Sequence, residues 1–198
     1  MALSASTLGN LILTNMHAFG AKGKNLPAFC NAVGTGIVMS IVGKSFVTID
    51  TGTVPGHGTG IGTGIMGPQS SVMEEIALSL MPTRGINAPK LMNAIMNATS
   101  SHLLDASLIT VDTPVFQGSG IVTVGSITVV ESEMASNIDS QLFLAQAHGV
   151  NRTILARAIA GGVAQQILAS GTGNLIITGS PDTSDTYSGS GAGVGTIL

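Results

Sequence analysis

The residues that could do chemistry are few and lie scattered along the chain. Histidine occurs at positions 17, 57, 102 and 148, and the only cysteine is Cys30. No histidine stands four residues from a second metal-ligating side chain, the spacing at which one helix face offers two ligands to a zinc ion. A single cysteine cannot form a disulfide within the chain. We therefore expect no metal centre and no cofactor.

His57 is the histidine with the most distinctive setting, the turn sequence Pro55-Gly56-His57-Gly58. We interpret it as a solvated turn residue. The alternative is that it lines the axis of a ring and coordinates an ion together with its symmetry mates, since imidazole binds metals readily.

Two glycine-rich stretches match nucleotide-binding loops in composition but not in context. A phosphate-binding loop has four residues between its glycines, whereas six separate Gly36 from Gly43. Gly62 to Gly67 fits the dinucleotide fingerprint literally, yet it ends an expected hairpin and does not lead from a strand into a long helix. We expect neither stretch to bind a nucleotide.

Candidate catalytic residues are missing as well. Asp50 and Asp112 occupy equivalent strand ends in two copies of a repeat, so they are interpreted as turn formers and not as a catalytic pair. No Gly-x-Ser-x-Gly elbow stands between a strand and a helix with an acid and a histidine after it. The sequence predicts a protein that is not an enzyme and has no small-molecule substrate.

The positions of these residues are set by a unit of about sixty residues that is repeated three times. Gly23, Gly85 and Gly149 anchor the copies and are 62 and 64 residues apart. Asparagine follows two residues later in each copy, at Asn25, Asn87 and Asn151. Each copy closes on a glycine phrase, and the residues of these phrases are Gly58, Gly60 and Ile61; Gly118, Gly120 and Ile121; Gly189 and Gly191. We divide the chain into residues 1–67, 68–130 and 131–198, which together form one continuous assembly unit.

Each copy begins with a predicted pair of helices. The first helices are expected at residues 8–19, 72–81 and about 137–147, and each ends near its anchor glycine, where a left-handed cap would favour glycine. The asparagine is expected to cap the second helix, because its side-chain oxygen can accept a hydrogen bond from an unpaired backbone N–H. In the second helices apolar residues recur every four positions, as in Phe29, Val33, Ile37 and Ile41.

Each copy is then expected to change to strands. Residues 46–49, 108–111 and 175–178 are rich in β-branched side chains, and the glycine phrases open the second strands at 61–65, 121–130 and 192–198. The expected fold class is α+β, with three tandem repeats that each contain a helical hairpin followed by a β-hairpin. Because bare strand edges favour aggregation, we expect these strands, including Leu198 at the chain end, to pair between repeats or between subunits.

Composition narrows the class of protein further. Charged residues make up 9% of the chain, against roughly 25% in ordinary domains. A free-standing soluble protein generally carries more charge, so the deficit indicates that other subunits cover part of the surface.

The net charge of −3 and the lack of a basic run argue against nucleic-acid binding. No stretch reaches the ~20 apolar residues that span a bilayer, and the first residues lack the positive charge of a secretory signal.

The helical corner Gly-x-Asn-x-Pro, the Gly-Ser/Thr-Gly-Ile strands and the low charge together resemble small repetitive virion proteins of tailed bacteriophages. The resemblance covers nearly the whole chain in its repeat layout and identifies no functional residue. It implies a subunit of a symmetric tail, baseplate, neck or capsid, made in the host cytoplasm and located in the virion.

We therefore expect a non-enzymatic structural subunit whose partners are further copies of itself, as a homo-oligomer, and other virion proteins. Nucleic acid and membrane are not expected among its partners. The alternative is a membrane-associated or pore-forming module, because small residues let helices pack closely within a bilayer.

Overall fold

The computed structural model describes backbone and side chains together for residues 3–41, 68–81, 85–103, 129–149 and 151–169. For the strands and the last residues of two helices it describes the backbone alone, and these residues are 45–50, 58–65, 104–105, 108–115, 120–122, 124–128, 170, 175–180 and 191–197.

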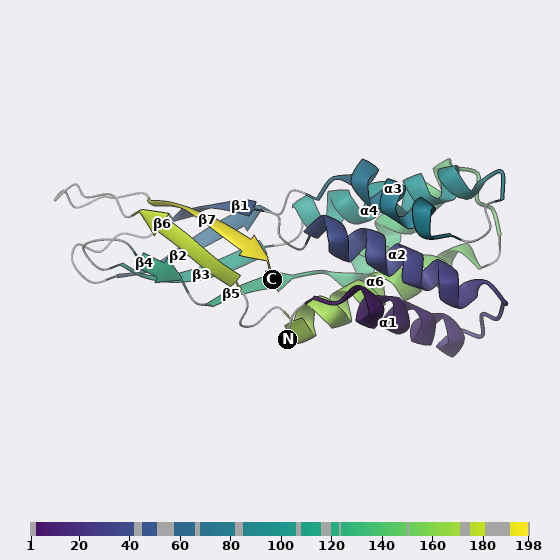
Figure 1. The fold of residues 1–198 in the computed structure, drawn as a ribbon, viewed down its shortest axis with the longest axis horizontal. Helices are drawn as coiled ribbons and strands as arrows, with labels where there is room; N and C mark the ends of the chain where they lie inside the picture. The colour runs from purple at the N-terminus through teal and green to yellow at the C-terminus, as the bar shows by residue number, and fades with distance from the viewer. Residues whose placement is uncertain are drawn as a thin grey trace.

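Six helices occur in three consecutive pairs (Figure 1). The pairs are α1 (Ala5–Ala18) and α2 (Leu26–Ile41), α3 (Ser70–Leu80) and α4 (Ala88–Asp105), and α5 (Glu131–Leu144) and α6 (Arg152–Ser170). Seven strands lie between and after these pairs, namely β1 (Ser45–Asp50), β2 (Gly58–Ile65), β3 (Leu108–Val115), β4 (Gly120–Val122), β5 (Val124–Thr128), β6 (Leu175–Ser180) and β7 (Gly191–Ile197).

The helices form one bundle in which neighbours along the chain are neighbours in space. Each helix packs against the next, and α6 packs against α1, so the six helices close a ring. Two long-range hydrogen bonds join its ends. Asn15 Nδ2 donates to the Ala158 carbonyl at 3.4 Å, and Gln166 Nε2 donates to the Ser4 carbonyl at 2.9 Å. The first and third copies are thereby held together directly.

The second helix of each pair supplies most of the core and is more deeply buried than the first, which also contributes core residues. The predicted four-residue stripe is confirmed in α2 for Val33, Ile37 and Ile41, which are all buried, whereas Phe29 is partly buried against the core. The equivalent residues of the three copies, Val33, Ile95 and Ile159, belong to the same hydrophobic core and are each 0% exposed. Burying a valine or isoleucine side chain in this way contributes roughly 1.5–3 kcal/mol.

Glycines let neighbouring helices approach until their backbones touch. A Cβ added to Gly34 of α2 would stand 2.6 Å from the Gly9 nitrogen of α1. One added to Gly36 would stand 2.5 Å from the Met73 carbonyl oxygen of α3. The small residues that the sequence places in these helices thus set the spacing of the ring, and any larger side chain would push two helices apart.

The strands lie beyond one end of the bundle (Figure 1). All their pairings are antiparallel, in the order β4-β6-β7-β1-β2-β3-β5. Three of these pairings join different copies, β2 with β3, β7 with β1, and β4 with β6. The two outermost strands, β4 and β5, belong to one stretch of the second copy.

The predicted α+β fold class has to be corrected. Across the residues whose side chains the structure describes, the molecule is all-helical, with six helices that take up 79% of those residues and neither strand nor sheet among them. All three helix pairs share one interior. The physical reason is that a helix pair of this size has apolar residues on more than one face, and only the other two pairs can cover them.

The first helix of each pair begins before its predicted start, and in α3 the difference is two residues, with the start at Ser70. α5 begins at Glu131, six residues before the expected start, and Glu131 and Glu133 lie in its first turn, where carboxylates favour the positive end of the helix dipole. α1 begins at Ala5, and its N-cap is Ser4, whose hydroxyl accepts a hydrogen bond from the Thr7 amide at 3.5 Å. The acidic first turn of α5 is a signal that was present in the sequence.

Candidate functional surface at the helix-corner end

The most distinctive surface lies at the end of the bundle away from the strands. Here α1 turns into α2, α3 into α4 and α5 into α6 (Figure 1). We call it the corner end and define it by the described residues within 17–26, 79–90 and 142–157.

Two of the three corners are closed by the same backbone geometry. After α1, Gly20 has a left-handed φ of 81°, its N–H donates to the His17 carbonyl, and the Ala21 N–H donates to the Met16 carbonyl. After α5, Gln146 occupies the equivalent position with φ 63° and the equivalent pair of hydrogen bonds. Both are Schellman caps, which satisfy the last carbonyls of a helix.

The predicted role of the anchor glycines as left-handed caps is therefore wrong. Gly20 is the glycine with positive φ among those described, and it stands three residues before Gly23. An added Cβ would meet nothing within 4 Å at Gly85 or Gly149, and only the Leu26 Cβ at 3.9 Å at Gly23. The carbonyls of these three glycines instead accept hydrogen bonds from Leu26, Ala88 and Arg152, which begin the second helices.

Asn25, Asn87 and Asn151 lie where an N-cap residue lies. Each backbone carbonyl accepts the first helical hydrogen bond of its second helix, from Phe29, Leu91 and Leu155 at 3.0, 3.0 and 2.9 Å. Capping by the asparagine side chains stays a prediction.

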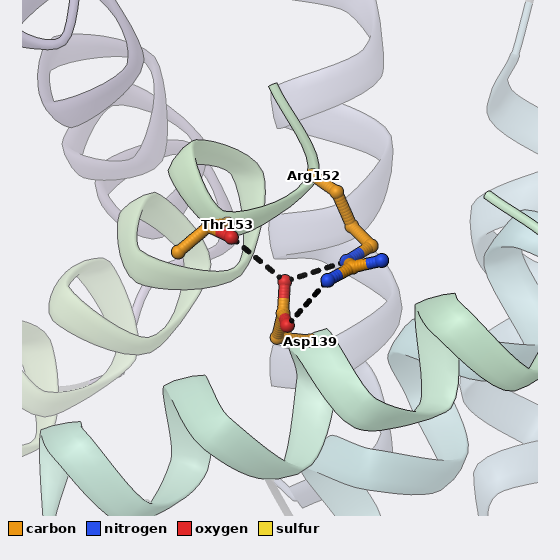
Figure 2. A network of polar contacts seen from close by, with 3 residues as sticks. All are labelled: Asp139, Arg152 and Thr153. Atoms are coloured by element: carbon orange, nitrogen blue, oxygen red, sulfur yellow. Dashed lines mark hydrogen bonds and ion pairs between the residues drawn. The ribbon is translucent and has the colours of Figure 1, made fainter. Parts of the chain in front are cut away.

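The corner of the third copy carries a polar clasp between α5 and α6, shown in Figure 2. Arg152 donates to both carboxylate oxygens of Asp139, at 2.8 and 3.0 Å, and the Thr153 hydroxyl donates to the same carboxylate at 3.0 Å. Hydrogen bonding from Arg152, and secondarily from Thr153, lowers the pKa of Asp139. The same contact raises the pKa of Arg152. The first two copies have Pro27 and Pro89 at the position of Thr153, so this arrangement belongs to the third copy.

Aromatic and cationic side chains pair at the same end. The guanidinium of Arg157 lies 4.9 Å from the ring centroid of Phe19, and that of Arg152 lies 5.1 Å from the ring of Phe143. His148 contacts Phe143 edge to face at 5.2 Å. Such cation–π pairs contribute roughly 0.5–1 kcal/mol at exposed sites and hold the rings in place.

Large apolar side chains remain exposed at all three corners. Ile86 is 95% exposed and Leu144 is 71% exposed, and Phe19, Leu80 and Phe143 are exposed to a smaller degree. Lys22, Lys24 and Lys90 lie exposed among them. Exposed apolar side chains surrounded by cations are typical of a contact surface, because isolated proteins seldom leave such groups together in water.

The sequence contained a signal of this surface that the repeat analysis missed. The residue immediately before each anchor glycine is basic or a histidine, Lys22 in the first copy, Arg84 in the second and His148 in the third. Arg84 lies outside the described residues. Aligning the copies by charge as well as by glycine would have pointed to the corner end.

The described residues of the predicted assembly strands pair with other strands of the same chain. In β2, Gly58, Gly60 and Ile61 pair with Val115, Thr113 and Asp112 of β3. Gly120 and Ile121 in β4 pair with Gly179 and Thr178 of β6, and Gly191 in β7 pairs with Asp50 and Ala192 pairs with Ile49 of β1. Gly118, Gly189 and Leu198 lie outside the described residues, as does His57.

The remaining chemically reactive groups are dispersed. Among the described residues no cluster of three or more His, Cys, Asp or Glu could hold a metal ion. Burial raises the pKa of the Cys30 thiol to about 11, so the thiol is neutral and shielded. Ser40, His102 and Gln166 are buried at equivalent positions of the three second helices. No described helix is long and apolar enough to cross a membrane.

Comparison of the chain with protein-family models, with curated proteins and with solved structures finds no match.

Proposed function

We propose that this protein is a non-enzymatic structural subunit of a bacteriophage virion, a component of a tail, baseplate, neck or capsid. It acts by associating with further copies of itself and with other virion proteins. The observation that carries the proposal is the corner end, where all three copies leave apolar side chains exposed although the helical core behind them is complete.

The corner end has the composition of a protein contact. Phenylalanine and arginine are enriched in interfaces, and here they occur as cation–π pairs that form within one chain. A side chain that is ordered in advance loses less conformational entropy on association. The ring of helices supplies the rigidity, since close glycine contacts fix the positions of its members.

The proposal is tested by the size of the purified protein. Size-exclusion chromatography with light scattering, over a range of protein concentrations, should show species larger than one chain of 19.8 kDa. Negative-stain electron microscopy of those species should show particles of uniform shape. A monodisperse monomer at the highest concentration, with no particles in the micrographs, would contradict the proposal.

A matched pair of variants locates the contact. Ile86→Ser removes the most exposed apolar side chain at the corner end, and Met39→Ser removes an exposed apolar side chain on α2. We expect Ile86→Ser to reduce association and Met39→Ser to leave it unchanged. Equal effects of the two variants would place the contact away from the corners.

A further inference from the structure

The charged residues of the corner end have one sign. The three stretches that define it contain six Lys and Arg and neither Asp nor Glu. Four of these cations have described side chains that are exposed, namely Lys22, Lys24, Lys90 and Arg157. Within the described part of the chain the one ion pair joins Arg152 to Asp139, so these four cations have no carboxylate partner there. The corner end is therefore positive although the whole chain has a net charge of −3.

Exposed apolar side chains lie among these cations. Of the eight large apolar side chains that are exposed in the described part of the molecule, five belong to the corner end. Lys22 follows Phe19 in the first corner, and Lys90 follows Ile86 in the second. In the third corner Arg152 lies over the ring of Phe143. A partner of this surface must therefore offer apolar contact and negative charge together.

The corner end of a second copy meets only the first of these requirements. Two corner ends could bring their apolar side chains together, but their exposed lysines would then approach one another as well. Like charges that face each other across an interface oppose association by several kcal/mol. A contact between two corner ends is consequently weaker than the exposed apolar side chains alone would make it.

We infer that the corner end docks on the acidic surface of a virion protein other than this chain, a surface on which Asp and Glu surround exposed apolar side chains. This inference rests on the proposed function and names the chemistry of its partner. Carboxylates opposite Lys22, Lys24 and Lys90 steer the encounter and fix its orientation, and burial of Ile86 and Leu144 adds apolar contact. The acidic partner competes with a second copy for the same apolar side chains and displaces it.

The aromatic residues of this surface favour a protein over an anionic lipid surface as the partner. Trp and Tyr are the side chains enriched where proteins meet the membrane interface, and the corner end contains neither. Its rings, Phe19 and Phe143, lie instead against the guanidinium groups of Arg157 and Arg152. Phenylalanine and arginine are both enriched in interfaces between proteins.

The experiment uses a synthetic peptide as the probe of an acidic partner. The peptide has about 20 residues, which form a helix about 30 Å long, with Leu along one face and Glu on the others. A second peptide has Lys in place of every Glu. Fluorescence anisotropy of the labelled peptides measures binding to the full chain at about 50 mM and about 500 mM salt, because added salt screens exposed charges. The wild-type chain should bind the Glu peptide about tenfold more tightly at the lower salt concentration, and it should not bind the Lys peptide.

Variants assign the binding to the corner end. Lys22→Gln, Lys24→Gln should remove most of the salt dependence, and Ile86→Ser should weaken binding at both salt concentrations because apolar contact is not screened. The control Ser132→Glu, Gln165→Glu lowers the net charge by the same amount at exposed positions away from the corners, and it should bind as the wild type does. Equal affinity for the two peptides, or equal loss of binding in the control and the lysine variant, would overturn the inference.

Analytical ultracentrifugation separates this inference from the proposed function. Association of the chain with itself through corner ends should tighten as salt is added, the opposite of peptide binding, and the Glu peptide should dissociate the larger species. A chain that forms those species but does not bind the Glu peptide would overturn the acidic partner and leave the structural function intact. Binding to phosphatidylserine vesicles without binding to the peptide would overturn it in favour of a lipid surface.

Discussion

Gly34 of α2 lies directly against Gly9 of α1, so that a Cβ on Gly34 would stand 2.6 Å from the Gly9 nitrogen and 3.0 Å from its Cα. Both glycines are buried in helices that belong to one pair. The atoms in the way are backbone atoms, which cannot rotate aside as a side chain can. The distance between α1 and α2 is therefore fixed by two residues that have no side chain at all.

Gly34→Ala should destabilise the protein. Overpacking of a tight interior costs roughly 1–3 kcal/mol, and the better helix propensity of alanine returns only about 1 kcal/mol. The measurement is the urea concentration at the midpoint of unfolding, compared between proteins whose unfolding free energy has the same dependence on urea concentration. The control Gly23→Ala should change the midpoint little, because a Cβ there meets only Leu26 at 3.9 Å. Equal tolerance of alanine at both positions would show that α1 and α2 can separate without cost.

Gln146→Gly should stabilise the protein by about 1 kcal/mol, because glycine adopts a left-handed φ without the steric cost borne by other residues. Thermal unfolding monitored by circular dichroism would measure the rise. The reciprocal change Gly20→Ala, at the equivalent cap of α1, should lower the melting temperature. A fall after Gln146→Gly would indicate that the glutamine side chain contributes more than the backbone strain removes.

Asn151→Ala should cost about 1 kcal/mol if the side chain caps α6 as the sequence predicts. Asn151→Ser, which keeps a capping oxygen, should lose only a fraction of that amount. Chemical unfolding of both variants beside the wild type makes the comparison. Equal losses for alanine and serine would exclude capping by the side chain.

The clasp at Asp139 should give the protein a dependence on acid pH. Its folded pKa is lowered, so its stabilising contribution is present above about pH 4, the value in an unfolded chain, and is lost as the pH falls through the folded pKa. The free energy of unfolding of Asp139→Asn should lie below that of the wild type at pH 7 and approach it near pH 2. Glu75→Gln changes the equivalent position of the second copy, where Ala88 and Pro89 replace Arg152 and Thr153, and should leave the free energy of unfolding at pH 7 close to that of the wild type.

Cys30 should make the stability of the folded protein depend on pH in the alkaline range. Its pKa is raised to about 11 in the folded protein, so unfolding releases a proton above about pH 8.5, and stability falls as the pH rises from there. Between pH 7 and pH 10 the wild type should lose more stability than Cys30→Ala, in which this titration is absent. Ellman's reagent should react with the native thiol only slowly. Rapid modification of the folded protein would show that the thiol is accessible and that its pKa is not governed by burial.

The sequence by itself determined the repeat, the apolar stripes of the second helices and the position of the asparagine before each of them. These are properties of neighbouring residues along the chain, and Val33, Ile95 and Ile159 occupy the same buried place because the pattern is the same in each copy. Local signals also existed for the start of α5, in Glu131 and Glu133, and for the basic corner, in Lys22 and His148.

Only the tertiary structure decided that the three helix pairs share one closed ring. The predicted α+β fold class is corrected for a separate reason, because the residues whose side chains are described form helices and no strands. It also decided that Gly20 and Gln146, and not the repeated glycines, take the left-handed turn, because the end of a helix is fixed by the packing of its last turn. The contact of Gly34 with Gly9 and the clasp of Asp139 with Arg152 join residues on different helices. No local pattern specifies such partners, since they depend on how far apart and in which orientation two helices come to rest.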